Sequence, residues 1–392
     1  MKKLIVVNSH PIQYFAPAYA SATREGVDIE VWYCSDESIR GTVDKQFGRT
    51  VKWDIPLLEG YAYRFFKNYS WKPSIYKGFW GLMNFGIASA LFKSPKSVVI
   101  VHSWGFFSYV LTILCAKLAG HKVGIRGESP LKQEIVKSKR NIFLKKTFFK
   151  LFILPTVDYF LYVGEQNKAF YRFLGVAESK LVFTPYSVDN DRFQAAAQEL
   201  NTQPSIQKET LGLNQATTVL LYSGKYIHKK RPLLLLEAYK QVQNDHTALI
   251  MVGDGELKSD MEKYISEHQL KHVVLTGFVN QSEIPAWYAL ADVFVMCSGD
   301  GETWGLSVNE AMNFSLPIVA SDRTGCTDDL VKNGVNGFVF ALDDANDLAN
   351  QLKQFIVMDK SNREKMGKQS LNIIKAYSYT EINKGFRQIA NF

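Results

Sequence analysis

The stretch of sequence that decides the fold is 293–320, VFVMCSGDGETWGLSVNEAMNFSLPIVA. It begins with a short apolar run, 293–296, and ends with another, 317–320, both of the length typical of buried strands. Between them, 307–314 has the spacing of a short helix that follows a glycine-containing loop. A strand, a helix and a second strand in this order predict a βαβ unit with a parallel sheet.

The same alternation continues along the chain in both directions. We expect further strands at 4–7, 29–34, 98–102, 123–126, 159–163, 181–184, 219–223, 248–252 and 273–276, and helices at 232–243, 256–268 and 283–290. The apolar periodicity is lost somewhere within 190–208 and resumes at Val219. The pattern predicts an α/β fold with two parallel-sheet domains, 1–190 and 191–375, and a final helix, 376–392, that returns to the first domain.

Composition supports this organisation. The chain has 392 residues, of which 46% are hydrophobic and 21% charged, as in globular proteins large enough for two cores. No apolar run approaches the ~18 residues of a membrane-spanning helix, and the first residues lack the pattern of a signal peptide. The cysteines, at 34, 115, 297 and 326, are too far apart for a metal motif. We therefore expect a cytoplasmic protein without a metal site.

The charge is unevenly distributed. Residues 1–200 contain 27 Lys and Arg against 16 Asp and Glu, a net +11, whereas residues 201–392 contain 19 against 22, a net −3. A basic first half predicts an anionic neighbour, such as a lipid surface, a phosphorylated acceptor or nucleic acid, or it is simply a soluble basic face. No nucleic-acid-binding motif is recognisable, so nucleic acid is not expected.

Basic and apolar residues interleave most densely in 132–152. On a helical wheel this segment is fairly amphipathic, with Lys145 in the apolar arc and Phe143 on the cationic side. It could lie on an anionic leaflet at the inner face of the cell membrane. The alternative is a domain helix with its apolar face in the core and its lysines in water.

The loop within 293–320 contains the residues best suited to bind a ligand. Gly305 allows a tight approach, and the amides of Leu306 and Ser307 at the following helix start suit a diphosphate. Glu302 and Glu310 could accept hydrogen bonds from sugar or ribose hydroxyls. Alternatively, Ser307 and Glu310 form only a capping box, in which the glutamate satisfies the helix start.

Three more loops follow predicted strands. The first contains Gly224, Lys225 and Lys230, and the two lysines could neutralise a diphosphate, although a solvated charged loop is an equal alternative. We expect both lysines to be exposed, so that their removal should spare the fold. The second contains Gly253 and Asp254, an ordinary turn by itself. The third contains Gly277, Phe278 and Val279, whose backbone could meet a base edge.

Together these elements resemble the donor domain of glycosyltransferase family four. The resemblance rests on Gly224-Lys225, Lys230-Arg231-Pro232, Val252-Gly253-Asp254-Gly255, Gly277-Phe278-Val279, Glu302-x7-Glu310 and Leu316-Pro317-Ile318-Val319-Ala320-Ser321-Asp322. It implies the GT-B architecture, two doubly wound Rossmann-like domains that face each other across a cleft. It also implies hexosyl transfer from a nucleoside diphosphate sugar, with retention and without a cofactor or metal, in cell-surface polysaccharide or glycolipid synthesis. The acceptor would be a saccharide or a lipid-linked saccharide.

The resemblance also implies residue roles. Lys225 and Lys230 would bind the diphosphate, and Glu302 would hold the donor sugar beside the amides of 305–307. Glu310 would grip the ribose, and the 277–279 loop would meet the base.

The first domain departs from the family pattern, since His10 and Gln13 lie where many relatives have a Gly-Gly loop. Arg126 and Glu128 follow a strand where relatives often have a histidine. With His102 these residues are candidates for the acceptor side, although Arg126 and Glu128 could form a simple ion pair. Alternative functions are a nucleotide-sugar epimerase or a phosphorylase of related architecture, or a non-enzymatic basic module that binds membranes.

Overall fold

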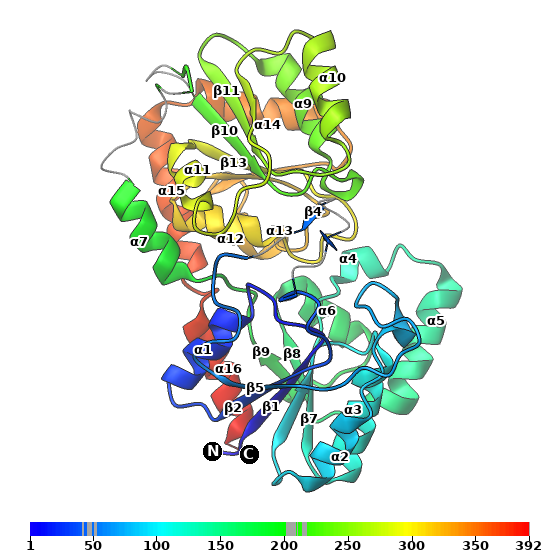
Figure 1. Ribbon diagram of the computed structural model, residues 1–392. Helices are drawn as coiled ribbons and strands as arrows, with labels where there is room; N and C mark the ends of the chain where they lie inside the picture. Colours follow the sequence, from blue (N-terminus) through cyan, green and yellow to red (C-terminus); the bar gives the residue numbers. More distant parts are fainter. Residues whose placement is uncertain are drawn as a thin grey trace. The chain divides into compact units, whose positions relative to one another are not determined.

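The computed structural model describes residues 1–40, 43–44, 49–50, 53–200, 209, 211–213 and 218–391. These residues form two compact units. The first unit contains Met1–Thr42, Ile55–Tyr186 and Ser378–Phe392, and the second contains Val43–Asp54 and Ser187–Tyr377. Figure 1 labels their helices and strands.

In the described part of the first unit, seven strands form a parallel sheet in the order β5-β2-β1-β6-β7-β8-β9. Their bounds are Leu4–Asn8 (β1), Ile29–Tyr33 (β2), Ala62–Phe65 (β5), Val98–Val101 (β6), Lys122–Arg126 (β7), Tyr159–Tyr162 (β8) and Leu181–Phe183 (β9). The strands β1, β2 and β6 are buried throughout, which explains their mostly apolar sequence; Glu30 of β2 pairs with Lys3 and Arg64.

The helices of the first unit lie on the two faces of this sheet. They are α1 (Ala16–Arg24), α2 (Gly86–Lys93), α3 (Phe107–Leu118), α4 (Leu131–Glu134), α5 (Lys139–Phe148), α6 (Glu165–Phe173) and α16 (Tyr379–Ala390), with the short helices η1 (Phe79–Gly81), η2 (Phe149–Ile153) and η3 (Glu178–Lys180). Residues of α2, α3, η2 and α6 share one core, while α1 packs against α16 (Figure 1).

The helix α16 belongs to the first unit although its sequence follows the whole of the second. Ile382, Phe386 and Ile389 are buried, and Arg387 pairs with Glu25 at a distance of 2.5 Å. Ser378 caps the helix by accepting the amide of Glu381. Burial of about three large apolar side chains, each contributing roughly 1.5–3 kcal/mol, holds this helix on the unit.

In the described part of the second unit, six strands form a parallel sheet in the order β12-β11-β10-β13-β14-β15. Their bounds are Thr218–Ser223 (β10), Thr247–Val252 (β11), Val273–Leu275 (β12), Val293–Met296 (β13), Ile318–Ser321 (β14) and Gly337–Phe340 (β15). A short antiparallel pair, β3 (Val43–Asp44) and β4 (Arg49–Thr50), also belongs to this unit.

The helices of the second unit connect these strands. They are α7 (Asn190–Leu200), α9 (Pro232–Val242), α10 (Lys258–Glu267), α11 (Ile284–Leu290), α12 (Leu306–Asn313), α13 (Thr327–Leu330), α14 (Ala345–Val357) and α15 (Lys360–Ile374), with η4 (His228–Lys230). Leu235 and Leu236 of α9 and Leu348 and Leu352 of α14 are fully buried in its core.

The expected α/β architecture with two parallel sheets is confirmed, and the expected strands agree with the observed ones to within one residue at each end. Two features differ. The strands β5 and β15 were not expected, and α7 occupies much of the segment that was expected to be a linker. The main part of the second unit begins at Ser187. Residues 201–208, the rest of that segment, lie outside the described residues.

Candidate active site

Backbone hydrogen bonds join the loops that follow the strands of the second sheet. Gly224 donates to the carbonyl of Val252 over 2.9 Å, and Tyr226 donates to that of Asp254 over 2.9 Å. Gly253 donates to the carbonyl of Gly277 over 3.1 Å. The expected binding loops after β10, β11 and β12 are therefore one connected surface at the carboxyl edge of the sheet, where open α/β sheets bind ligands.

Gly253 is required by this close approach. A Cβ atom added to it would lie 1.9 Å from the carbonyl oxygen of Gly224, and its φ of +148° is one that other residues rarely adopt. The side chain of Asp254 accepts the amide of Gly255 over 2.9 Å and so stabilises the turn. The Gly-Asp-Gly sequence, weak by itself, thus holds two loops together.

Lys230 and Glu302 are brought together from two different loops. Their side chains form an ion pair and are only 15% and 12% exposed. Burial acts to raise the pKa of Glu302, but the charges of Lys230 and Lys229 outweigh it and hold this pKa below its ordinary value. The prediction that Lys230 is exposed is therefore wrong. Its side chain is largely buried because it forms an ion pair with the Glu302 carboxylate.

The other residues of these two loops lie close by in the sequence and are partly open to solvent. Lys225 is half-buried, and its carbonyl accepts the Tyr222 hydroxyl over 3.1 Å. Lys229 donates from Nζ to the carbonyl of Gly301 over 3.2 Å, and its own carbonyl accepts the amide of Gly299 over 2.8 Å. These contacts tie the loop after β10 to the loop after β13.

The helix α12 begins at this junction. Its N-cap is Gly305, with a φ of +104° and no capping side chain, so Ser307 lies inside the first turn. The capping-box alternative is therefore wrong. Leu306 and Ser307 are partly exposed, and the first amides of a helix have no partner within it. This end of α12 offers N–H groups and a partial positive charge to a ligand.

Glu310 lies deeper than Glu302. It is 2% exposed, and its Oε2 accepts the hydroxyl of Tyr288 over 2.7 Å. Nearby, the indole of Trp304 donates to Asn309 over 2.8 Å. The hydroxyl of Tyr288 therefore meets this carboxylate, whereas Lys230 meets that of Glu302.

Residues 53 and 54 contribute to the loop around Phe278, although no sequence motif indicates it. The ring centroid of Trp53 lies 6.3 Å from that of Phe278, in the loop expected to meet a base, and Val279 follows it. Asp54 accepts the amide of Ser282 over 3.0 Å. Both residues belong to the second unit, although the expected domain 1–190 included them. No periodicity or motif marks them.

The first unit has its own cluster of polar groups after β1 and β6. His102 is hydrogen-bonded to the Tyr19 hydroxyl over 3.1 Å, and His10 to Ser9 over 2.9 Å. Burial lowers the pKa of His10 to about 4, and burial together with the nearby Arg126 charge holds that of His102 well below its usual range. Both imidazoles are therefore neutral at pH 7. Gln13, in the same loop as His10, is partly exposed.

Arg126 is a buried cation at the end of β7. It is 4% exposed and lies beside the stacked rings of Phe15 and Tyr186, at 5.1 and 4.9 Å from their centroids. Its Nη2 donates to the carbonyls of 184 and 185, while Nη1 has no hydrogen-bond partner among the described residues. No ion pair of the described residues joins it to Glu128, so the simple ion-pair alternative is wrong.

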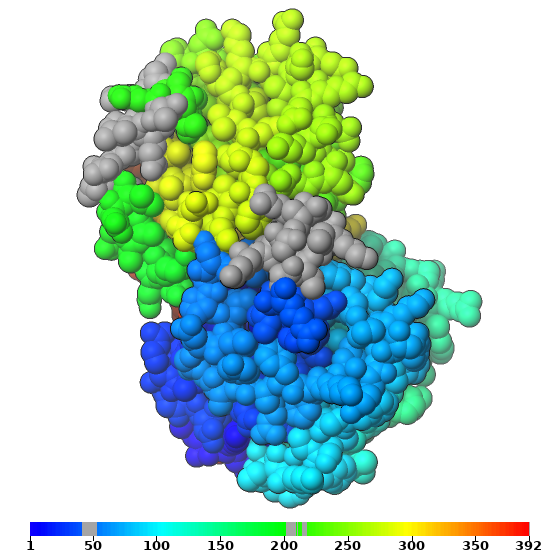
Figure 2. Space-filling view, viewed as in Figure 1, coloured from blue at the N-terminus to red at the C-terminus, as the bar shows by residue number. Residues whose placement is uncertain are grey.

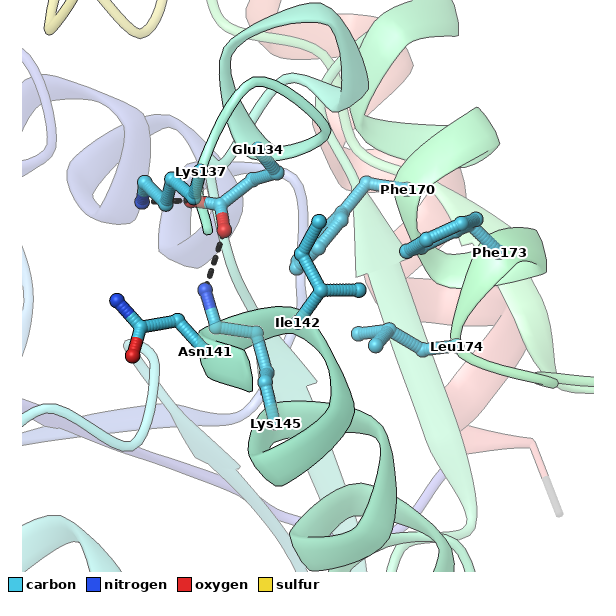
Figure 3. A pocket seen from close by; sticks show the side chains of 8 residues that line it. All are labelled: Glu134, Lys137, Asn141, Ile142, Lys145, Phe170, Phe173 and Leu174. Atoms are coloured by element: carbon cyan, nitrogen blue, oxygen red, sulfur yellow. Dashed lines mark hydrogen bonds and ion pairs between the residues drawn. The ribbon is translucent and has the colours of Figure 1, made fainter. Parts of the chain in front are cut away.

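The segment 132–152 is not one continuous helix but α4, α5 and η2. Figure 3 shows Lys145 turned inward, where it pairs with Glu134, and Ile142 facing Phe170, Phe173 and Leu174. No residue of α5 is buried, and Phe143 and Leu144 are exposed. Phe148 of α5 nevertheless packs against the core, in which Phe149 and Ile153 of η2 are buried. The alternative of a domain helix with its apolar face in the core therefore holds in part.

The chain is similar to proteins of a known family. The family model for glycosyl transferases group 1 matches residues 205–372, which include every one of the loops described in the second sheet. The second unit therefore contains a region that matches the group 1 glycosyltransferases, and the relatives of the chain are named as glycosyltransferases. The chain is 29% identical to the UDP-Gal:alpha-D-GlcNAc-diphosphoundecaprenol alpha-1,3-galactosyltransferase of Escherichia coli, over 70% of this chain and 72% of that protein.

Other similar proteins extend the comparison to the whole chain. The lipopolysaccharide 1,2-N-acetylglucosaminetransferase of Salmonella typhimurium is 26% identical over 60% of this chain and 62% of its own. Anabaena HepE, solved in complex with UDP, superposes with a TM-score of 0.74 over 99% of both chains at 15% identity. This likeness confirms the GT-B fold.

Two kinds of feature are not found in the part of the chain that the structure describes. None of the described helices is both long and apolar enough to span a bilayer. Nor do any three of the described His, Cys, Asp and Glu side chains gather as metal ligands would.

Proposed function

We propose that this glycosyltransferase moves a hexosyl unit from a nucleoside diphosphate sugar to a saccharide or lipid-linked saccharide. The observation that carries the proposal is the largely buried Lys230–Glu302 ion pair, which joins the loop after β10 to the loop that leads into α12. It supplies a cation for a diphosphate and a carboxylate for sugar hydroxyls in one place. The Escherichia coli and Salmonella relatives are named for transfers of this kind.

In this proposal the donor lies across the carboxyl edge of the second sheet. Lys225 and Lys230 neutralise the diphosphate together with the amides of Leu306 and Ser307. Glu302 accepts hydroxyls of the transferred sugar, while Glu310 accepts those of the ribose after exchanging its bond from Tyr288. The backbone of Phe278 and Val279 meets the base, and the glycines at 224, 253 and 305 let the chain approach. Neither metal nor cofactor is needed, because these groups supply the positive charge.

We propose transfer with retention, by departure and attack on the same face of the sugar. The lysines stabilise the charge that develops on the leaving diphosphate, whose oxygen accepts the proton of the acceptor hydroxyl. On the first unit, the neutral imidazoles of His10 and His102, with Gln13 and Glu128, would orient the acceptor. The free Nη1 of Arg126 would bind a group with negative charge.

Calorimetry with a panel of nucleoside diphosphates tests the donor site. Lys225→Ala should weaken binding by roughly 1.5–3 kcal/mol, the contribution of a charged hydrogen bond, whereas Lys240→Ala on the exposed side of α9 should not. Unchanged affinity in Lys225→Ala would mean that the phosphates bind elsewhere.

The two glutamates provide a second test. Glu302→Gln should depress turnover yet spare the bare nucleotide, which has no sugar. Glu310→Gln keeps an acceptor for Tyr288 and should weaken the bare nucleotide as well. If it lowers only the melting temperature, Glu310 is structural. Incubation with the donor alone separates the proposal from an epimerase, which needs no acceptor.

We further propose that the enzyme works in the cytoplasm, at the inner face of the cell membrane, in the synthesis of cell-surface polysaccharide or glycolipid. The exposed Phe143 and Leu144 beside the lysines of α5 support this. They are the part of 132–152 that would meet anionic lipid.

A further inference from the structure

A cluster of aromatic rings, most of them exposed, lies on the first unit in the loop that follows β5 and at the start of α3. Its centre is Trp80, whose ring centroid lies 4.9 Å from that of Phe79, 5.5 Å from Phe107 and 6.0 Å from Trp71. Phe85 and Tyr69 continue it, at 5.7 Å from Phe107 and 6.0 Å from Phe85. We call these six residues the aromatic cluster. Trp71 is 68% and Trp80 48% exposed.

The loop that presents this cluster, between β5 and α2, is fixed by internal hydrogen bonds. The Asn68 side chain donates to the carbonyl of Gly81 over 2.9 Å and accepts the amide of Met83 over 2.9 Å. The Asn84 side chain donates to the carbonyls of Cys34 and Phe66, which anchors the end of the loop. The rings are therefore held open to solvent by a folded backbone.

The exposed apolar surface continues along two helices. Phe85 is the N-cap of α2 and Phe92 follows it by two turns, while Leu114 and Leu118 follow Phe107 on one side of α3. Phe92 is 59% and Leu118 78% exposed. The opposite sides of both helices are buried in the core, and α2 packs against α3. Each helix is thus apolar on two sides, of which only one is covered.

The charged residues in the stretch of sequence that contains the cluster are all basic. Residues 60–127 contain nine Lys and Arg and no Asp or Glu. Lys67, Lys72, Lys77 and Lys93 are exposed, and none of them pairs with a carboxylate among the described residues. Lys67 lies over the ring of Tyr69, 5.0 Å from its centroid. An apolar patch bordered mostly by cations, with Glu37 beside Ile75 and Asp158 beside Lys117 as the nearby carboxylates, complements a surface that is apolar below and anionic above.

We propose that the aromatic cluster and the exposed sides of α2 and α3 dock on an anionic lipid bilayer. Trp and Tyr rings suit the headgroup level, where one end is apolar and the other wet, and the lysines suit lipid phosphates. A saccharide chain could also stack on Trp71 and Trp80, but it would leave Phe92, Leu114 and Leu118 uncovered. In Figure 2 the loop lies within the light-blue part of the surface.

This inference rests on the proposed use of a lipid-linked acceptor but assigns the membrane contact to a different surface. The helix α5 would then lie beside the main contact or outside it. The two surfaces can be distinguished, because each contains exposed apolar residues that can be replaced separately.

Co-sedimentation with vesicles tests the proposal. The full chain should pellet with phosphatidylglycerol-containing vesicles, less with pure phosphatidylcholine vesicles, and less again at high salt, which screens the lysines. The double variant Trp71→Ser, Leu118→Ser should partition about tenfold more weakly. Val357→Ser on the second unit is the matched control, and Phe143→Ser with Leu151→Ser on α5 and η2 tests the other surface; all three residues are exposed.

Quenching by brominated lipids reports the contact directly. The tryptophan fluorescence of the full chain should fall with vesicles of brominated phosphatidylglycerol. The double variant Trp71→Phe, Trp80→Phe should still pellet, because phenylalanine keeps the surface apolar, but should lose most of the quenching. This readout does not depend on removing the contact, so a folding defect cannot imitate it.

Three results would overturn the proposal. They are partition of Trp71→Ser, Leu118→Ser equal to that of the unchanged chain, loss of partition only in the α5 variant, and binding of free oligosaccharide but not of vesicles. Calorimetry of nucleotide binding on the same variants keeps the two proposals separate. Intact nucleotide binding without vesicle binding would refute only the docking, and the converse would refute only the donor site.

Discussion

Replacing Lys230 with methionine isolates the cation of the Lys230–Glu302 pair, because methionine keeps most of the length and apolar volume of the stem. Glu302 would then be a carboxylate with 12% exposure and no ion pair from Lys230. Breaking a buried pair by removing one partner costs about 3–5 kcal/mol, whereas an exposed pair contributes about 0–1 kcal/mol. At 15% and 12% exposure, we expect the free energy of unfolding of the second unit to fall by about 2–3 kcal/mol.

The pH dependence of this loss has a definite sign. The pKa of Glu302 is lowered in the folded protein, so the pair stabilises the fold above the ordinary carboxyl pKa and ceases to do so as the pH falls through the folded value. Without Lys230, burial acts to raise this pKa, opposed by the charge of Lys229 and a hydrogen bond from Ser298. The difference between Lys230→Met and the unchanged chain should therefore be large at pH 7 and shrink toward pH 4.

Urea unfolding of Lys230→Met, Glu302→Gln and the double variant measures the coupling. We expect the double variant to be more stable than the sum of the single losses predicts, by about 1–2 kcal/mol, as neighbours in contact are coupled. Lys229→Met is the matched control, because Lys229 contacts a backbone carbonyl instead. Additive losses, or a loss in Lys230→Met that does not change with pH, would refute the reasoning.

Three further substitutions test other parts of the site. Gly253→Ala should cost more than about 3 kcal/mol in urea unfolding, since its Cβ meets a carbonyl, whereas Gly277→Ala, with positive φ but open space, should cost about 1 kcal/mol. For His10, whose pKa is lowered to about 4, protonation of the unfolded chain costs stability as the pH falls below 6.5. His10→Gln should therefore remove up to about 3 kcal/mol of the loss between pH 7 and pH 4, and an unchanged slope would contradict this. Trp53→Ala should weaken nucleoside diphosphate binding about three- to tenfold if its ring supports the base beside Phe278; an unchanged dissociation constant would rule that out.

The buried parallel strands were the most predictable part of the fold. Strand β13 was expected with its observed bounds, because a strand that is covered on both faces is a continuous apolar run. Strand β5 was missed because it lies at an edge of the sheet and all four of its residues are exposed. The helix α7 was missed because only Phe193 and Ala197 provide its apolar period.

The site was predictable as a set of loops but not as a set of pairs. The rule that ligands bind at the carboxyl edge of a parallel sheet places Lys230 and Glu302 in the correct loops. This rule does not predict that the side chains of Lys230 and Glu302 form an ion pair. Their loops follow different strands, and no sequence periodicity relates two residues that are so far apart along the chain. Trp53 belongs to the second unit because Val43–Asp54 leaves the first unit and packs with the second. No local sequence pattern predicts this.

The position of α16 has a consequence for how the protein is made. Every residue of the second unit leaves the ribosome before Ile382, Phe386 and Ile389, the side chains that complete the first unit. Although domains usually fold in the order of their synthesis, here the sheet that is translated first must wait with one side uncovered while the second domain forms. During that interval the apolar surface of α1 that α16 later covers is exposed. A chaperone that binds nascent chains would bind to this surface.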